Sequence, residues 1–257
     1  MQKFMIFLSV ITTLFIINNV IGGEIDKTLH ENCLHPTIYV GQANGKGGFG
    51  SGVIVRSEKV KDNLYKNIFL TCAHITTPLV QSYEVRQYIY EDGIQVKQVK
   101  SYPAVFFSYN NELDIAIGLF LSEELMPVAK LNFDPKIFIG NEVFRIGCGL
   151  GDDPRLDYGK LTTYKKNSNK PLMRTSVMTV SGDSGGPLFH ENKVIGIMVS
   201  VRANKNGQLN SISYAVPLDR FKQWNKANDN NLNFAWTTDK LPELHYMYLQ
   251  FKDYTIK

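Results

Sequence analysis

The sequence predicts an all-β protein built from two packed antiparallel barrels of about a hundred residues each, with a helix near the end. Short runs of β-branched and aromatic residues, bounded by Gly, Asn and Lys, recur through both halves of the chain. Helical periodicity is nearly absent before Pro217. The 257 residues, 44% hydrophobic and 20% charged, are enough for one large β domain or two small ones.

The first half supplies the strands of one barrel. They are expected at Thr37–Val40, Gly52–Val55, Asn67–Thr71, Tyr83–Tyr90 and Val96–Phe107. Pro103 interrupts the last of these runs. Because proline lacks a backbone N–H, we expect a break or a sheet edge there.

The second half has the same pattern of short strand-like runs, although the two halves show no tandem sequence repeat. Its strands are expected at Glu142–Ile146, Tyr158–Tyr164, Leu172–Thr179, Pro187–His190, Val194–Val201 and Ile212–Val216. After them, Leu218, Phe221 and Trp224 follow at helical spacing, which predicts a terminal helix with one apolar face.

The two ends of the chain differ from the body. Lys3 precedes an apolar run and two small residues, Gly22 and Gly23, so residues 1–23 are predicted to be a signal peptide and the mature protein secreted or periplasmic. The alternative is a membrane anchor, but the strongly apolar part covers only residues 4–17, and a span needs about 20. We therefore expect no stable membrane anchor after signal removal.

The rest of the chain divides into two regions. A two-barrel domain is predicted at residues 24–222, with its barrels at about 33–125 and 126–216, and residues 223–257 form an extension of unknown role.

Charge and cysteine content exclude several function classes. The net charge of +4 is mild, and no basic helix or aromatic-interleaved basic patch indicates a nucleic-acid partner. Cys33, Cys72 and Cys148 allow at most one disulfide, for which Cys33–Cys148 is the first candidate, and Cys72 reads as a small buried hydrophobe. No paired Cys/His spacing predicts a metal site, and no cofactor is expected.

In one glycine-rich stretch, residues 181–189, glycines flank the hydroxyl of Ser184. In a tight turn, the N–H groups of Gly182 and Ser184 can converge where an oxyanion forms. The same pattern fits the nucleophile elbow of α/β-hydrolases, but a strand-like run at 193–200 follows here where that fold has a helix. A plain surface turn is the third interpretation.

Two further residues suit nucleophilic catalysis. His74 follows the apolar run 69–73, and Asp114 directly precedes the strand-like run 115–120. Each has an ordinary alternative, since His74 could be a buried structural histidine and Asp114 a turn residue. Glu112 is the nearest competitor to Asp114 as the acid.

Together these segments resemble trypsin-like serine proteases. Residues 182–187 match the motif Gly-Asp-Ser-Gly-Gly-Pro, residues 71–75 resemble the Thr-Asn-Ala-His-Val of HtrA-type members, and Asp114 opens an Asp-Ile-Ala segment typical of the family acid. The order His, Asp, Ser is also that of trypsins. The resemblance covers about residues 37–221, and it implies two six-stranded barrels, with no PDZ module in evidence.

The resemblance implies a role for each matching residue. His74, Asp114 and Ser184 would form the catalytic triad, and the N–H groups of Gly182 and Ser184 the oxyanion hole. The substrate would be a polypeptide, with Met178 at the floor of the primary pocket and Val199, Ser200 and Val201 as the strand that pairs with it. An apolar Met178 predicts cleavage after small or medium apolar residues. The alternative function is a catalytically inactive binding protein of the same fold.

Activation is a separate question. In trypsins the residue equivalent to Asp183 pairs with a newly cut N-terminus, and an amino group on Ile21 could play that part here. The alternative is that Ile21 is merely the tail of the signal segment.

Overall fold

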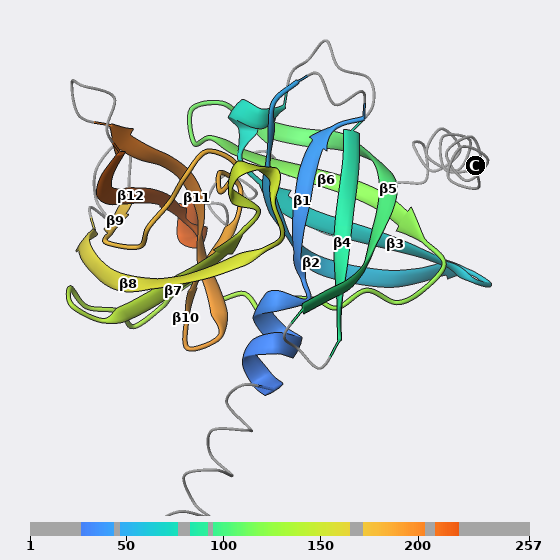
Figure 1. The fold of residues 1–257 in the computed structure, drawn as a ribbon, viewed down its shortest axis with the longest axis horizontal. Helices are drawn as coiled ribbons and strands as arrows, with labels where there is room; N and C mark the ends of the chain where they lie inside the picture. The colour runs from blue at the N-terminus through green and yellow to red at the C-terminus, as the bar shows by residue number, and fades with distance from the viewer. Residues whose placement is uncertain are drawn as a thin grey trace, which may run out of the picture.

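A computed structural model describes residues 27–43, 47–76, 83–91, 95–164, 172–203 and 209–220. Within them the chain forms two closed six-stranded antiparallel barrels that lie side by side (Figure 1). The predicted fold class is confirmed.

The first barrel has the strand order β1-β2-β3-β6-β5-β4. Its strands are β1 (Thr37–Gln42), β2 (Phe49–Lys61), β3 (Leu64–Thr71), β4 (Tyr83–Glu91), β5 (Gln95–Asn110) and β6 (Ile115–Ser122). β-branched and aromatic side chains such as Ile38, Ile54, Phe69 and Phe120 are fully buried in its core. Burial of these side chains, each worth about 1.5–3 kcal/mol, drives closure of the barrel.

Of the two expectations for Pro103, the break is absent, because β5 continues unbroken through this residue, whereas an edge is found on the side that faces β6. Pro103 lies opposite Glu84 of β4, and pairing with β6 begins only at Ala104. The missing N–H of the proline therefore costs no ladder hydrogen bond on the β6 side.

The second barrel has the order β10-β11-β12-β9-β8-β7. Its strands are β7 (Glu142–Gly147), β8 (Arg155–Tyr164), β9 (Met173–Thr175), β10 (Pro187–His190), β11 (Lys193–Ala203) and β12 (Leu209–Pro217). Buried apolar residues including Val143, Leu161, Leu188 and Ile195 fill its centre. The strand predicted at Leu172–Thr179 is shorter than expected, because pairing with β12 ends at Thr175.

Short helical segments also occur: η1 (His30–Leu34), which continues a helical turn at 27–29, η2 (Ala73–Ile75) and η3 (Gly149–Gly151). The chain is also helical at 218–220, with Leu218 buried, while Phe221 and Trp224 of the predicted terminal helix lie outside the described residues.

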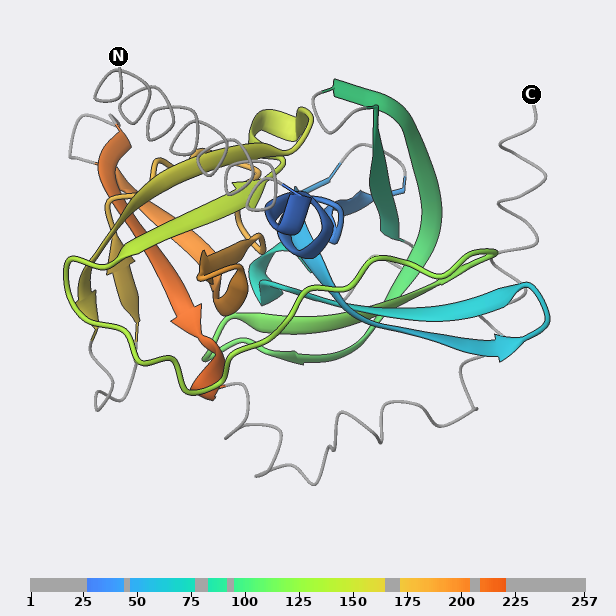
Figure 2. The same cartoon turned by 90° about the horizontal axis from the view of Figure 1, so that it is seen from below.

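The segment 123–141 connects the barrels and runs along both of them (Figure 2). Ala129 N–H donates to Ile54 O of the first barrel at 2.9 Å. Val194 N–H donates to Lys130 O at 2.8 Å, and Asn132 N–H donates to Val194 O at 2.8 Å, both in the second. The linker is thus hydrogen-bonded to each barrel in turn.

All three cysteines are free and buried, so the predicted Cys33–Cys148 disulfide is wrong. Cys33 lies in η1 against the core of the first barrel, whereas Cys148 follows β7 of the second.

The predicted signal peptide and the extension at 223–257 lie outside the described residues. In the ranges that the structure describes, no helix has the length and apolar character needed to cross a bilayer.

Candidate active site

Neighbouring strands bring His74 and Asp114 together. β3 ends at Thr71 and leads into η2, which carries His74, while Asp114 precedes β6, the antiparallel partner of β3. Asp114 has a left-handed backbone, with φ of 55°. Its Oδ2 lies 2.8 Å from His74 Nδ1, and its Oδ1 accepts a hydrogen bond from His74 N–H at 2.8 Å. Because a carboxylate can only accept, this geometry puts the ring proton on Nδ1 and the lone pair on Nε2.

The loop that carries Ser184 packs directly against this region. Gly182 and Gly185 have φ of 96° and 86°, in the range that L residues rarely adopt. A Cβ on Gly185 would collide with Thr71 Oγ1 and would lie 3.1 Å from Cys72 N. Glycine at this position therefore allows the loop to approach the end of β3 at Thr71, three residues before His74.

The backbone N–H groups of Gly182 and Ser184 have no acceptor among the described residues, and the N–H of Ser181 in the same loop has none either. The carbonyl preceding Gly182 N, that of Ser181, accepts from Leu150 N–H at 2.6 Å, and the carbonyl preceding Ser184 N, that of Asp183, accepts from Gly186 N–H at 3.0 Å. In a planar trans peptide the N–H points away from the carbonyl of the same unit. Both N–H groups are thereby directed away from these anchoring hydrogen bonds.

Ser51 of β2 ties the loop to both barrels. Its Oγ donates to Gly182 O at 2.7 Å and accepts from Cys148 N–H at 2.7 Å. Its N–H donates to Ser184 O at 2.7 Å. Ser51 is fully buried, so one residue of the first barrel fixes two carbonyls of the loop and one N–H of the second barrel.

Replacing Ser51 with Ala should lower the free energy of unfolding by about 1–3 kcal/mol, because Cys148 N–H and Gly182 O would stay buried without a partner. Loss of the Gly182 anchor should also slow any reaction at Ser184. Urea unfolding would measure the first effect, and the rate at which a fluorophosphonate reagent labels Ser184 would measure the second.

Ser57→Ala is the matched control. Ser57 lies on the same strand and hydrogen-bonds Asn67 and Met126, away from the loop. It should lower stability without changing the labelling rate. Equal labelling rates in the two variants would contradict a role for Ser51 in holding the loop.

Asp183 is fully buried and pairs with a second buried charge, Arg145 of β7. Arg145 Nη2 lies 2.8 Å from Asp183 Oδ2 and 2.6 Å from Asp157 Oδ2, and Val180 N–H donates to Asp183 Oδ2 at 2.7 Å. Burial raises the pKa of Asp183, and the Arg145 guanidinium opposes this shift. Arg145 thus gives Asp183 a positively charged partner within the described residues, whereas Ile21, the partner considered from the sequence, lies outside them.

The third member of the predicted triad is close in the fold but not hydrogen-bonded. Within the described residues, no hydrogen bond joins Ser184 to His74, and Cys72 Sγ lies 3.7 Å from His74 Nε2. Hydrogen bonds in substrate-free sites are often formed only when the substrate binds. The roles assigned to these residues stay predictions.

The residues predicted to bind substrate are placed less clearly. The side chain of Met178 is 61% exposed, more than the floor of an enclosed pocket would be. Val199 is buried, and the backbones of Ser200 and Val201 pair with Tyr214 and Ser213 of β12. The specificity prediction is therefore untested.

Sequence reasoning did not single out Ser51 or Arg145. Two signals were present: Ser51 lies between two glycines, and Arg145 interrupts an apolar strand. A charged residue inside a buried run is rarely placed there without a partner.

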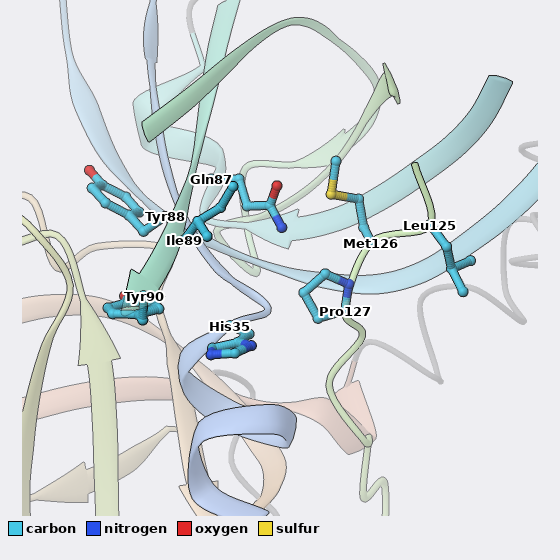
Figure 3. A pocket seen from close by; sticks show the side chains of 8 residues that line it. All are labelled: His35, Gln87, Tyr88, Ile89, Tyr90, Leu125, Met126 and Pro127. Atoms are coloured by element: carbon cyan, nitrogen blue, oxygen red, sulfur yellow. The ribbon is translucent and has the colours of Figure 1, made fainter. Parts of the chain in front are cut away.

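A pocket of about 400 Å³ lies elsewhere, lined by residues of β4 and of segment 125–127 together with His35 (Figure 3). His35 stacks on Tyr90 with ring centroids 5.5 Å apart. None of the predicted site residues lines this pocket, so it has no direct part in chemistry at Ser184.

Comparison with known families agrees with this geometry. A model described as "Trypsin-like peptidase domain" matches residues 50–197, more than half of the chain. The chain belongs to the trypsin-like peptidase family. The match includes His74, Asp114 and Ser184.

Relatives of this trypsin-like peptidase include protease Do-like 14 from Arabidopsis thaliana, 24% identical over 72% of this chain and 42% of the relative. A DegP-like periplasmic serine endoprotease from Pseudomonas putida GB-1 is 31% identical over 37% of this chain and 20% of the relative. The chain therefore spans less than half the length of these relatives.

Two solved structures share the fold. The serine endoprotease from Yersinia pestis has a TM-score of 0.58 at 18% identity, over 77% of this chain and 64% of that one. The MamO protease domain from Magnetospirillum magneticum has a TM-score of 0.60 at 16% identity, over 76% of this trypsin-like peptidase and 98% of that chain.

Proposed function

We propose that this trypsin-like peptidase is an exported serine endopeptidase that cleaves polypeptides through an acyl-enzyme. The observation that carries the proposal is the doubly hydrogen-bonded His74–Asp114 pair beside a loop in which the N–H groups of Gly182 and Ser184 have no acceptor among the described residues. The names of DegP-like relatives, which describe periplasmic serine endoproteases, support both the activity and the export.

In this mechanism Ser184 Oγ attacks the carbonyl carbon of a peptide bond while His74 Nε2 accepts the hydroxyl proton. Asp114 keeps the other ring proton on Nδ1 and stabilises the imidazolium that forms. The N–H groups of Gly182 and Ser184 stabilise the oxyanion. His74 then donates its proton to the leaving amine, and an ester on Ser184 remains until water attacks it by the reverse sequence.

A fluorophosphonate probe tests this function. It should attach to Ser184 in the folded protein, because the hydroxyl, the base and the two N–H donors act together on the phosphonate as they would on a peptide. Labelling should disappear in Ser184→Ala and persist in Ser181→Ala, which changes an exposed serine three residues earlier.

The peptide site of labelling, read by mass spectrometry, decides the outcome. Absence of labelling from a folded chain would favour the alternative, a catalytically inactive binding protein of this fold. Labelling that survives in Ser184→Ala would assign the nucleophile to another residue.

A further inference from the structure

Cys72 and His74 bring two metal-binding atoms to one point of the site. Cys72 Sγ lies 3.7 Å from His74 Nε2, and the ligand atoms of Cys72, His74 and Asp114 all lie within 4.8 Å of one another. Zn²⁺ binds thiolate sulfur at about 2.3 Å and imidazole nitrogen at about 2.0–2.1 Å. With these bond lengths, a sulfur–nitrogen separation of 3.7 Å gives an S–Zn–N angle of about 116°, close to the tetrahedral value.

The imidazole is already arranged as a zinc ligand. Nδ1 is hydrogen-bonded to Asp114 at 2.8 Å, so the lone pair is on Nε2, the nitrogen that faces the sulfur. Zinc-binding histidines almost always donate their second ring N–H to such a carboxylate, which fixes the ring and strengthens the ligand. Asp114 would therefore orient His74 and would not itself coordinate the ion.

An ion can reach this point from solvent, but it must displace the proton of the Cys72 thiol. The His74 side chain is 46% exposed, so a cation can reach Nε2 from solvent, while Cys72 lies beneath it and is fully buried. Burial raises the pKa of the Cys72 thiol, with a further contribution from the Asp114 carboxylate, so without metal the thiol stays protonated. A bound zinc ion removes that proton outright, because it stabilises the thiolate directly.

We propose that Cys72 and His74 form an inhibitory Zn²⁺ site, with water filling the remaining coordination positions. The ion occupies the same Nε2 lone pair that accepts the Ser184 proton, so zinc binding and general-base catalysis exclude each other. The inhibitory consequence rests on the proposed function, whereas the metal site itself does not. Removal of zinc restores the free imidazole without any covalent change.

Metal binding can be tested in the Ser184→Ala chain, where catalysis plays no part. Added Co²⁺, which adopts the same tetrahedral geometry, should give a thiolate-to-cobalt charge-transfer band in the near ultraviolet. The band should be absent in Cys72→Ala and in the similarly sized Cys72→Ser, and present in Cys33→Ala, which changes another buried cysteine. No band in the parent chain, or a band that survives both Cys72 substitutions, would overturn the site.

Inhibition is tested with Zn²⁺ and the fluorophosphonate probe on the chain with Ser184 intact. Zinc should slow labelling and a chelator should restore it, each variant being compared with its own zinc-free rate. Loss of a residue that only hydrogen-bonds to a metal ligand costs about 10–100-fold in metal affinity. Cys72 would be a ligand itself, so its loss should raise the half-inhibitory zinc concentration at least about tenfold. An unchanged concentration in both Cys72 variants would refute the inhibitory role, even where the cobalt band is present. If the probe does not label Ser184 even without zinc, the proposed function is contradicted, and the cobalt band alone then tests the metal site.

Discussion

Asp114→Asn should lower the turnover of a polypeptide substrate by about 10⁴-fold while leaving the chain folded. Asp114 accepts two hydrogen bonds, one on each oxygen, from His74 N–H and from the ring. An asparagine offers only one acceptor oxygen, and its NH₂ group must face one of these two donors. The ring can avoid that clash by carrying its proton on Nε2. A protonated Nε2 can no longer accept the proton of Ser184.

The measurement is kcat and KM on a fluorogenic protein substrate, together with thermal unfolding. A fall in kcat with little change in KM is expected, because the interaction matters in the transition state. Glu112→Gln is the matched control, since it removes an exposed acid two residues away and should leave kcat unchanged. A large loss in Glu112→Gln with normal turnover in Asp114→Asn would move the role of the acid to Glu112.

Arg145→Met should lower the free energy of unfolding by about 3–5 kcal/mol, because it leaves the Asp183 carboxylate buried without its guanidinium. Arg145 is fully buried and also donates from Nε to Met178 O at 2.7 Å and from Nη1 to Arg155 O at 3.2 Å. Asp183 lies between the two N–H groups of the predicted oxyanion hole. Labelling of Ser184 should therefore slow as well.

Urea unfolding of three further variants separates the charge effect from packing. Arg155→Met removes a half-exposed guanidinium whose Nη2 lies 4.0 Å from the same carboxylate, and it should cost less than about 1 kcal/mol. Asp183→Asn alone and combined with Arg145→Met completes a double-mutant cycle. The double variant should be more stable than the sum of the single effects predicts. Simple additivity would mean that the pair contributes no coupling energy.

The sequence predicted most of the framework, for reasons visible in particular residues. β-branched and aromatic runs located the strands because nearly every one of them buries a face inside a barrel, as Ile54 and Phe69 do. The short motifs around His74, Asp114 and Ser184 identified the family correctly, and the glycines of the last motif take positive φ values that other residues rarely adopt.

Contacts between distant segments could not be predicted in the same way. The partner of Asp183 is 38 positions earlier in the chain, on a strand of the same barrel, and local periodicity carries no information about such a pair. The Cys33–Cys148 prediction was wrong because cysteine count limits pairing without locating the residues in space. Cys72 was predicted to be a buried hydrophobe, and it is buried, but its distance from His74 Nε2 depends on the turn into η2.

The hydroxyl of Ser51 has a consequence for how this protein can come apart. It belongs to the first barrel, and both of its hydrogen-bonding partners belong to the second. A polypeptide severed within 123–141 would keep each sheet's own ladders, yet the half containing Ser184 would lose the donors that hold Gly182 O and Ser184 O. The anchoring of the Ser184 loop is thus a property of the two docked barrels together, because neither half holds both the donors and the acceptors.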